Sequence, residues 1–192
     1  GASDVELRGN GYLIEGSGAD GSIGVQVYNP DQTPIENVTI RDLRVENWDL
    51  GIEVGNVQED PERDLLPVQA TLRNVESNDN EGAGMRLASA SGSEFENVTA
   101  ENNGGDGIIL WETSDVRFDR INATGNEDSG LNLWDVVEDS EFTWVTATDN
   151  GGAGIVIDVE VSENTVSDSY VANNEGHGVR FGTLGSSNTI QN

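Results

Sequence analysis

A short phrase that recurs every 23 or 24 residues constrains the fold of this chain more than any other feature. Each copy holds an asparagine, three residues that are mostly small or acidic, a glycine, and then two apolar residues separated by one residue of any kind. The glycines of the five regular copies are spaced 23, 23, 24 and 24 residues apart. Those copies span 80–87, 103–110, 126–133, 150–157 and 174–181, and two looser copies, 20–27 and 47–54, precede them.

Apolar residues within one repeat alternate, as in β-strands, and show no helical spacing. Between residues 95 and 110, Phe95, Val98 and Ala100 point to one side, a turn follows, and Ile108 and Leu110 alternate again. A unit this short cannot bury its own apolar face, so it must stack on its copies. The pattern predicts an all-β parallel β-helix of about seven to eight coils, with strands about 4.8 Å apart.

Aligned positions of successive repeats keep their apolar character, as stacking requires. We expect two inward columns of side chains along the axis of the solenoid. The first contains Ile40, Leu72, Phe95, Phe118, Phe142, Val166 and Ile190, and the second contains Val27, Val54, Leu87, Leu110, Leu133, Ile157 and Phe181.

The repeat resembles that of right-handed parallel β-helix proteins of the pectate-lyase-like superfamily, often described as PbH1 repeats, over nearly the whole chain. In that family an asparagine ladder commonly lines one turn, each amide bonding to the coils on either side. Stacked amides suit this role because each has donors and an acceptor, and the glycines after them suit left-handed or crowded turns. We therefore interpret these residues as structural; they are Asn80, Asn103, Asn126, Asn150 and Asn174.

Charge narrows the range of partners. Asp and Glu total 36 against 9 basic residues, all of them Arg, for a net charge of -27. Such a surface repels phosphate backbones, so nucleic acid is not an expected partner. The acidic, lysine-free composition resembles that of proteins from salt-loving archaea and bacteria, where counter-ions screen the repulsion. A Ca²⁺-binding surface is the alternative, because carboxylate oxygens suit hard cations.

Other composition features limit the remaining classes. The chain has no Cys, which excludes disulfides and thiolate metal sites, and no cofactor besides Ca²⁺ is indicated. No apolar run approaches the roughly 20 residues of a membrane span. The 192 residues fit one β-helix domain, 1–192, which we expect to be cut from a longer chain because it begins without Met and its end coils lack caps. Flanking domains or end-to-end self-association would cover such open ends.

The regular repeat is interrupted most strongly at residues 55–69. Gly51 and Gly84 are 33 residues apart, about ten more than the repeat, and the insertion is rich in acidic residues. Insertions at one corner of a solenoid often form the wall of a binding cleft. The alternative is a tolerated surface loop, since long loops cost little stability.

The strand after each glycine places a second set of side chains outward. In pectate-lyase-like enzymes this sheet and the turn after it form the substrate cleft. Here the alignment predicts that Trp111 and Trp134 stack on adjacent coils and face solvent, with Glu112, Asp135 and Asp158 beside them. Flat indoles beside polar groups are suited to sugar rings. The alternative is that the two indoles pack under a loop or against another domain.

Catalytic candidates lie on the same face. Glycoside hydrolysis needs two carboxylates flanking a bond, and Asp135 and Asp158 lie on neighbouring coils. Lyases of this family use a Lys or Arg base, often with Ca²⁺; Lys is absent, and Arg86 and Arg180 are the candidates. His177 lies in a segment that resembles the Gly-His-Gly of polygalacturonases. The paired aspartates of that family are missing, however, and Gly-x-Gly recurs throughout this scaffold.

These patterns predict a secreted or cell-surface domain that binds polysaccharide or acts as a rigid adhesive module in high salt. Three sequons, at Asn37, Asn97 and Asn122, suit an extracellular protein. One alternative is a polysaccharide lyase, glycoside hydrolase or epimerase acting on glycans that contain uronic acid. Another is a self-associating component of a surface layer or fibre.

Overall fold

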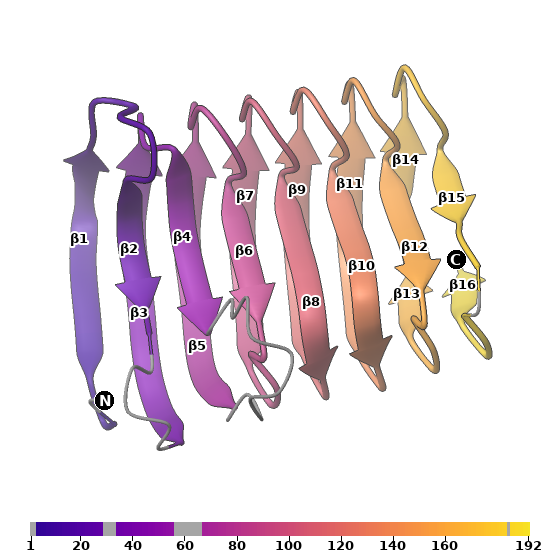
Figure 1. Cartoon of the computed structure of the whole chain (residues 1–192), viewed down its shortest axis with the longest axis horizontal. Helices are drawn as coiled ribbons and strands as arrows, with labels where there is room; N and C mark the ends of the chain where they lie inside the picture. Colours follow the sequence, from indigo (N-terminus) through magenta and orange to yellow (C-terminus); the bar gives the residue numbers. More distant parts are fainter. Residues whose placement is uncertain (1–2, 29–33, 56–66, 184) are drawn as a thin grey trace.

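The chain forms a parallel β-solenoid in the computed structural model, which describes residues 3–28, 34–55, 67–183 and 185–192. The coils stack side by side from the N-terminus to the C-terminus (Figure 1). Every strand pair is parallel. Parallel pairing requires a long crossover between neighbours, and here each crossover runs through the opposite sheet. The described residues contain no helix that could cross a membrane.

The first sheet has nine strands, in the order β1-β3-β5-β7-β9-β11-β13-β16 with β14 also paired to β11. Its strands are β1 (Glu6–Glu15), β3 (Ile35–Glu46), β5 (Val68–Asn78), β7 (Glu94–Glu101), β9 (Arg117–Thr124), β11 (Glu141–Thr148), β13 (Thr165–Ser167), β14 (Tyr170–Ala172) and β16 (Thr189–Gln191).

The second sheet has seven strands, in the order β15-β12-β10-β8-β6-β4-β2. These are β2 (Ile23–Val27), β4 (Leu50–Gly55), β6 (Met85–Ala88), β8 (Ile108–Ser114), β10 (Leu131–Glu138), β12 (Ile155–Val159) and β15 (Val179–Phe181). Seven stacked strands are separated by six steps of one turn each, so the solenoid has slightly fewer turns than the seven to eight coils predicted. Most of the predicted 55–69 insertion, residues 56–66, lies outside the described residues.

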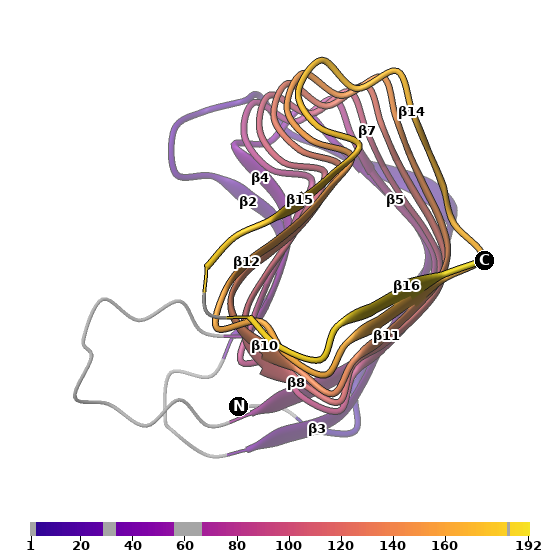
Figure 2. The ribbon, with the colours of Figure 1, turned by 90° about the vertical axis from the view of Figure 1, so that its right-hand side faces the viewer.

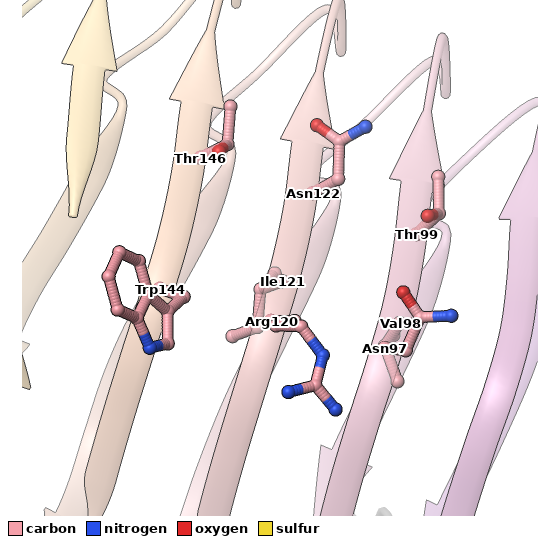
Figure 3. A pocket seen from close by; sticks show the side chains of 8 residues that line it. All are labelled: Asn97, Val98, Thr99, Arg120, Ile121, Asn122, Trp144 and Thr146. Carbon is pink, nitrogen blue, oxygen red and sulfur yellow. The ribbon is translucent and has the colours of Figure 1, made fainter. Parts of the chain in front are cut away.

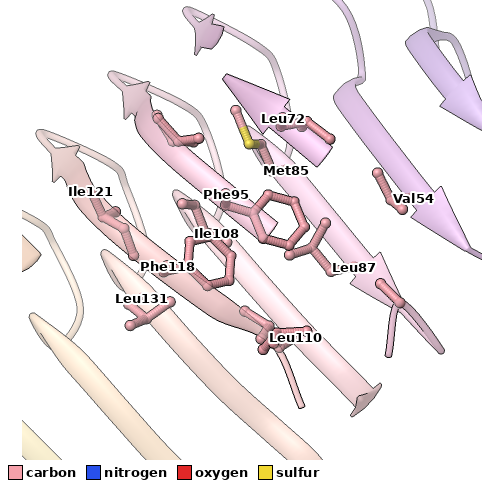
Figure 4. Packing of buried hydrophobic residues seen from close by; sticks show 14 of the residues in the cluster. Val54, Leu72, Met85, Leu87, Phe95, Ile108, Leu110, Phe118, Ile121 and Leu131 are labelled. Carbon is pink, nitrogen blue, oxygen red and sulfur yellow. The ribbon is translucent and has the colours of Figure 1, made fainter. Parts of the chain in front are cut away.

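The core lies between the two sheets, and both predicted apolar columns are confirmed. Strand register aligns Leu72, Phe95, Phe118 and Phe142 on successive coils. The rings of Phe95 and Phe118 stack at 4.3 Å and 10°, and those of Phe118 and Phe142 at 5.3 Å and 15°. Figure 4 shows the rings of Phe95 and Phe118 among apolar residues of the second sheet, including Met85. Burial of this continuous stack holds the coils in one register.

The predicted asparagine ladder is also present. Asn103 Nδ2 donates to Asn126 Oδ1 at 2.9 Å, the backbone N–H of Asn103 donates to the same oxygen at 3.1 Å, and Nδ2 also donates to the Ser77 carbonyl. Equivalent amide bonds of 2.9–3.0 Å join each neighbouring pair from Asn80 to Asn174. These amides satisfy buried backbone groups at the turn between the sheets, so their role is structural.

Glycine follows the ladder because the backbone approaches too closely for a side chain. A Cβ at Gly84 would lie 2.6 Å from Asn103 Nδ2 and 2.7 Å from the Gly107 carbonyl oxygen. Crowding, rather than a left-handed backbone, therefore selects glycine at this position.

A second ladder at the opposite corner was not predicted. The backbone N–H of Val116 donates to Ser140 Oγ at 3.2 Å, and that of Ser140 donates to Asn164 Oδ1 at 3.0 Å. Asn164 Nδ2 then donates to Asn188 Oδ1 at 3.1 Å. The row mixes serine with asparagine, so it leaves no single repeated letter in the sequence.

The first sheet bends around a corner partway along each coil, to the right in Figure 2. One residue of each coil from β3 onward has a left-handed backbone there, with φ between 51° and 60°. Register aligns these residues in one column: Asp42, Asn74, Asn97, Arg120, Trp144 and Asp168. Asn and Asp tolerate this conformation better than other residues with a side chain, which accounts for four of the six.

Candidate functional site

The outer face of the second sheet carries the residues that the sequence singled out. One outward column is confirmed by the strand register. Its side chains are mostly polar and include two arginines with three coils between them. The column contains Gln26, Glu53, Arg86, Ile109, Asn132, Val156 and Arg180.

Trp111 and Trp134 form an aromatic pair on this face. Their ring centroids are 5.4 Å apart, and the ring planes are tilted by 46°. Trp134 is 47% exposed, and Trp111 is half-buried. Two large aromatics that touch on the surface form a contiguous exposed apolar patch, which needs an explanation beyond folding.

The predicted alignment of the two tryptophans is wrong by one residue. Trp111 pairs in register with Asp135, because β10 shifts register between Leu133 and Asp135. The physical reason is the change of repeat from 23 to 24 residues, which adds one residue to β10 at Trp134. Strand β12 keeps the longer spacing, since Asp135 pairs with Val159. Trp134 therefore lies across from Asp158, and its ring reaches back to Trp111.

The strained corner after this pair is a further feature of the face. Glu112 and Val136 both have φ of 47°. For a β-branched residue such as Val136 this conformation is a real outlier. Outliers of this kind cluster at functional sites because surrounding contacts must hold them.

The predicted catalytic side chains are only partly brought together. Arg180 Nη2 lies 2.8 Å from Asp158 Oδ2, so these two form one ion pair. Arg86 instead binds Glu53, with Nη2 2.6 Å from Oε1. Asp135 lies one coil from Asp158, as the sequence suggested, but it pairs in register with Trp111, which the predicted alignment did not place there. The two candidate arginines therefore belong to separate ion pairs in different coils.

His177 lies away from these carboxylates. It is exposed, and its carbonyl accepts the backbone N–H of Gly154 at 2.9 Å, as the equivalent residue does in each of the four preceding coils. Strand β15 separates His177 from Gly182, which packs against Asp158, and the five intervening steps span about 16 Å. The structure therefore gives His177 no contact with the acids.

Asp106 is a candidate that the sequence reasoning missed. Burial raises the pKa of its carboxyl, although Asn132 Nδ2 and the backbone N–H of Ser129 each donate to it at 2.9 Å. Asn132 lies two residues before Trp134 on the same strand, so Asp106 is bonded to the strand that carries Trp134, about five residues along the sheet from the aromatic pair. A charged residue in the small Gly-x-Gly slot was the signal available in the sequence.

Two polar atoms on this face lack partners within the described part of the chain. They are Nε1 of Trp111 and Oδ1 of Asn132, and both are buried. The described residues contain no group of three or more His, Asp or Glu side chains placed to hold a metal ion.

Comparisons with solved structures show the fold. The chain resembles the Agl-KA catalytic domain with a TM-score of 0.44 and 20% identity, over 81% of this chain and 26% of that one. It resembles the enzymatically active domain of bacteriophage CBA120 tailspike protein 2 with a TM-score of 0.54 and 10% identity, over 98% of this chain and 35% of that one. The chain thus spans about a third or less of either protein. A comparison with curated proteins gives no match.

The family is defined by the repeat itself. A model described as the right-handed β-helix region matches residues 23–192, which include all seven strands of the second sheet. The handedness agrees with the strong preference of parallel crossovers for right-handed connection. This chain belongs to the right-handed β-helix family.

Proposed function

We propose that the outer face of the second sheet binds a polysaccharide, with Trp111 and Trp134 as the platform for the sugar rings. The observation that carries this proposal is the 5.4 Å contact between two indoles, one of them 47% exposed, on the outside of a rigid sheet. An apolar sugar face packs on an indole, and polar groups at the rim bind the hydroxyls. Asp135, Asp158 and Glu112 supply such groups.

Charge selects the kind of glycan. Each of the eight arginines within the described ranges lies in an ion pair with a carboxylate, and the ninth, Arg63, falls outside those ranges. With a net charge of -27, the remaining surface repels a chain of uronates. We therefore favour a neutral glycan over the uronic-acid polymers that the pectate-lyase-like resemblance implies.

Hydrolysis of the bound glycan is the second candidate, and Asp106 is the observation that favours it. A carboxyl whose pKa is raised by burial is suited to act as a general acid. The second carboxylate that hydrolysis needs would be Asp128, the acidic residue whose charge also raises the pKa of Asp106. The fold is compatible with catalysis, since it resembles that of the enzymatically active domain of bacteriophage CBA120 tailspike protein 2.

The setting that we infer is extracellular and rich in salt. The acidic, lysine-free surface supports adaptation to salt, and a rigid rod with sugar-binding aromatics suits a secreted or cell-surface module. Flanking domains or self-association of the rods remain part of this proposal, and sedimentation at increasing protein concentration tests the latter.

A glycan array tests the binding proposal. Neutral glucans, xylan and chitin fragments are compared with oligogalacturonate in low and molar KCl. We expect binding to a neutral chain that is weakened by Trp111→Ala and by Trp134→Ala. Tyr12→Ala is the matched control, because Tyr12 is 75% exposed on β1, in the other sheet. Undiminished binding in both tryptophan variants, or a preference for oligogalacturonate, contradicts the proposal.

Release of reducing ends from the bound glycan tests hydrolysis separately. Asp106→Asn should abolish release while leaving binding in place. If wild-type protein binds a neutral glycan but releases no reducing ends, the chain is a binding module only.

A further inference from the structure

We propose that the outer face of the first sheet carries a second sugar-binding surface, centred on Trp144, which takes a neutral glycan chain running along the solenoid. This surface and the Trp111–Trp134 pair belong to different sheets, which face outward in different directions (Figure 2). The proposal for this surface can therefore be tested independently of the function proposed above.

The surface contains a hollow of about 590 Å³ that spans β7, β9 and β11. Two parallel rows of side chains line it, each with one residue per coil (Figure 3). The corner row holds Asn97, Arg120 and Trp144, and the adjacent row holds Thr99, Asn122 and Thr146.

The hollow continues toward the next coil. A second depression of about 370 Å³ shares Trp144 and Thr146 with the first and adds Asp168 and Tyr170. Trp144 is 58% exposed and Tyr170 is 65% exposed. The indole therefore stands as a ridge between two open depressions, a shape that lets a chain molecule contact it from both sides.

Folding does not explain Trp144. At its corner position the backbone is left-handed, with φ of 59°, and four of the six residues in that column are Asn or Asp. A bulky side chain in this conformation is strained. The side chain is also more than half exposed, so it gains little from burial. Local backbone preference favours Asn here, and the small buried area of the indole offers little compensation, which points to a role in binding.

The chemistry of the rows fits a neutral sugar chain. Amides and hydroxyls repeat once per coil, at a rise of about 4.8 Å, which is close to the length of one hexose unit. Successive sugars would therefore meet equivalent rows of side chains. Arg120 is the one cation among the described residues that line the hollow, and its guanidinium lies 2.6 Å from both Glu96 and Asp119. Its charge is thus compensated, which disfavours a polyanionic ligand.

Trp144→Asn separates binding from stability. It places the residue preferred by the column in the strained position, so the melting temperature should stay the same or rise, while affinity for the neutral glycan falls about tenfold or more at this surface. The measurement is calorimetric titration with hexamers of neutral glucans, xylan and chitin. The protein is made in a host without N-glycosylation, because Asn97 and Asn122 begin sequons and lie in the hollow.

Combining variants distinguishes the two surfaces. In protein that carries Trp111→Ala and Trp134→Ala, residual binding should disappear when Trp144→Asn is added. If Trp144→Asn has no effect in either background, this proposal is overturned while the first one stands. If Trp144→Asn alone abolishes all binding, the first proposal fails and this one stands.

A protein partner is the competing occupant of the surface. Concentration-dependent sedimentation that Trp144→Asn abolishes, with no glycan bound at any concentration, would show that the face binds a second copy of the chain and would overturn the proposal.

Discussion

Arg86 holds its guanidinium Nη2 2.6 Å from Glu53 Oε1 on the outer face of the second sheet, and Glu53 is only 3% exposed. Gln26 Nε2 binds the other carboxylate oxygen at 2.5 Å. A carboxylate this deep depends on its partners, because removing one partner leaves a buried charge uncompensated. The pair therefore joins β4 and β6 in a way that a surface ion pair would not.

Arg86→Ala should destabilise the protein by about 3–5 kcal/mol, since it leaves the buried Glu53 charge without its partner. Urea unfolding monitored by tryptophan fluorescence measures the loss. Arg117→Ala is the matched control, because Arg117 and Glu141 are both well exposed, and its loss should be below about 1 kcal/mol. Adding Glu53→Leu to Arg86→Ala should recover much of the stability. Equal losses for the two arginine variants would contradict this account.

Asn126→Ala interrupts the asparagine ladder at its middle. It removes the acceptor of two bonds from Asn103 and the donor to Asn150 Oδ1 and to the Ala100 carbonyl. Because these groups are buried, the loss should be about 3 kcal/mol or more. Asn174→Ala, at the half-buried end of the ladder, should reduce the free energy of unfolding by less, because water reaches the polar groups that lose their partner there. The free energy of unfolding in urea checks both, and similar losses would argue against a cooperative ladder.

Phe118→Ala opens a cavity in the stack of three rings. Phe118 is fully buried and contacts Phe95 and Phe142, so a loss of about 3–5 kcal/mol is expected. For a chain of this size that corresponds to a fall in melting temperature of roughly 6–20 °C. Phe181→Ala is the control: Phe181 is 61% exposed, so its melting temperature should change little. A small effect of Phe118→Ala would show that neighbouring coils collapse into the space.

Asp106 should make stability depend on pH with a definite sign. Burial raises the pKa of its carboxyl, so the folded state retains the proton over a range where the unfolded state has lost it. The contribution of this group to stability therefore falls as pH rises from the unfolded pKa through the raised folded pKa, and it stays unfavourable above that range. Asp106→Asn removes this penalty, so its melting temperature relative to wild type should increase with pH across that interval.

The control for Asp106 is Asp149→Asn at an exposed corner with φ of 58°. It removes a surface charge where Asn also tolerates the backbone, so it shows how much of the change comes from the lower net charge alone. A falling difference for Asp106→Asn would contradict the raised pKa, as would a carboxyl carbon shift that titrates at or below the ordinary value near 3.8.

Salt dependence tests the acidic surface. With a net charge of -27, self-repulsion should be screened by KCl, and the melting temperature should rise steadily into the molar range. Adding millimolar Ca²⁺ at constant ionic strength should give no further rise if general screening dominates. A Ca²⁺-specific increase at low KCl would instead support the calcium interpretation of the carboxylates.

The sequence was most informative where the repeat is strict. The columns from Leu72 to Phe142, the asparagine ladder and the parallel winding all follow from equal spacing of like residues, because one stacking register satisfies every coil. The mixed row that contains Ser140 and Asn164 was missed, because serine and asparagine occupy equivalent positions in it and no single residue type repeats.

The candidate site was predicted less completely, for reasons that lie in three dimensions. A one-residue change in repeat length placed Trp134 opposite Asp158 and left Trp111 opposite Asp135, and only the strand register shows where the extra residue is accommodated. The raised pKa of Asp106 arises from burial by neighbouring coils, which no local pattern encodes.

By itself the sequence determined the fold, the ladder and the face on which two tryptophans lie, since periodic burial of apolar side chains leaves a single way to stack. The tertiary structure alone decided which charges are paired, which carboxyl is buried, and that Trp144 stands exposed at a left-handed corner between two depressions. The physical reason is that periodicity fixes which way a side chain points. Its neighbours across the coils, 23 or 24 residues away in the sequence, determine whether its charge is paired, how far it is exposed to solvent and how strained its backbone is.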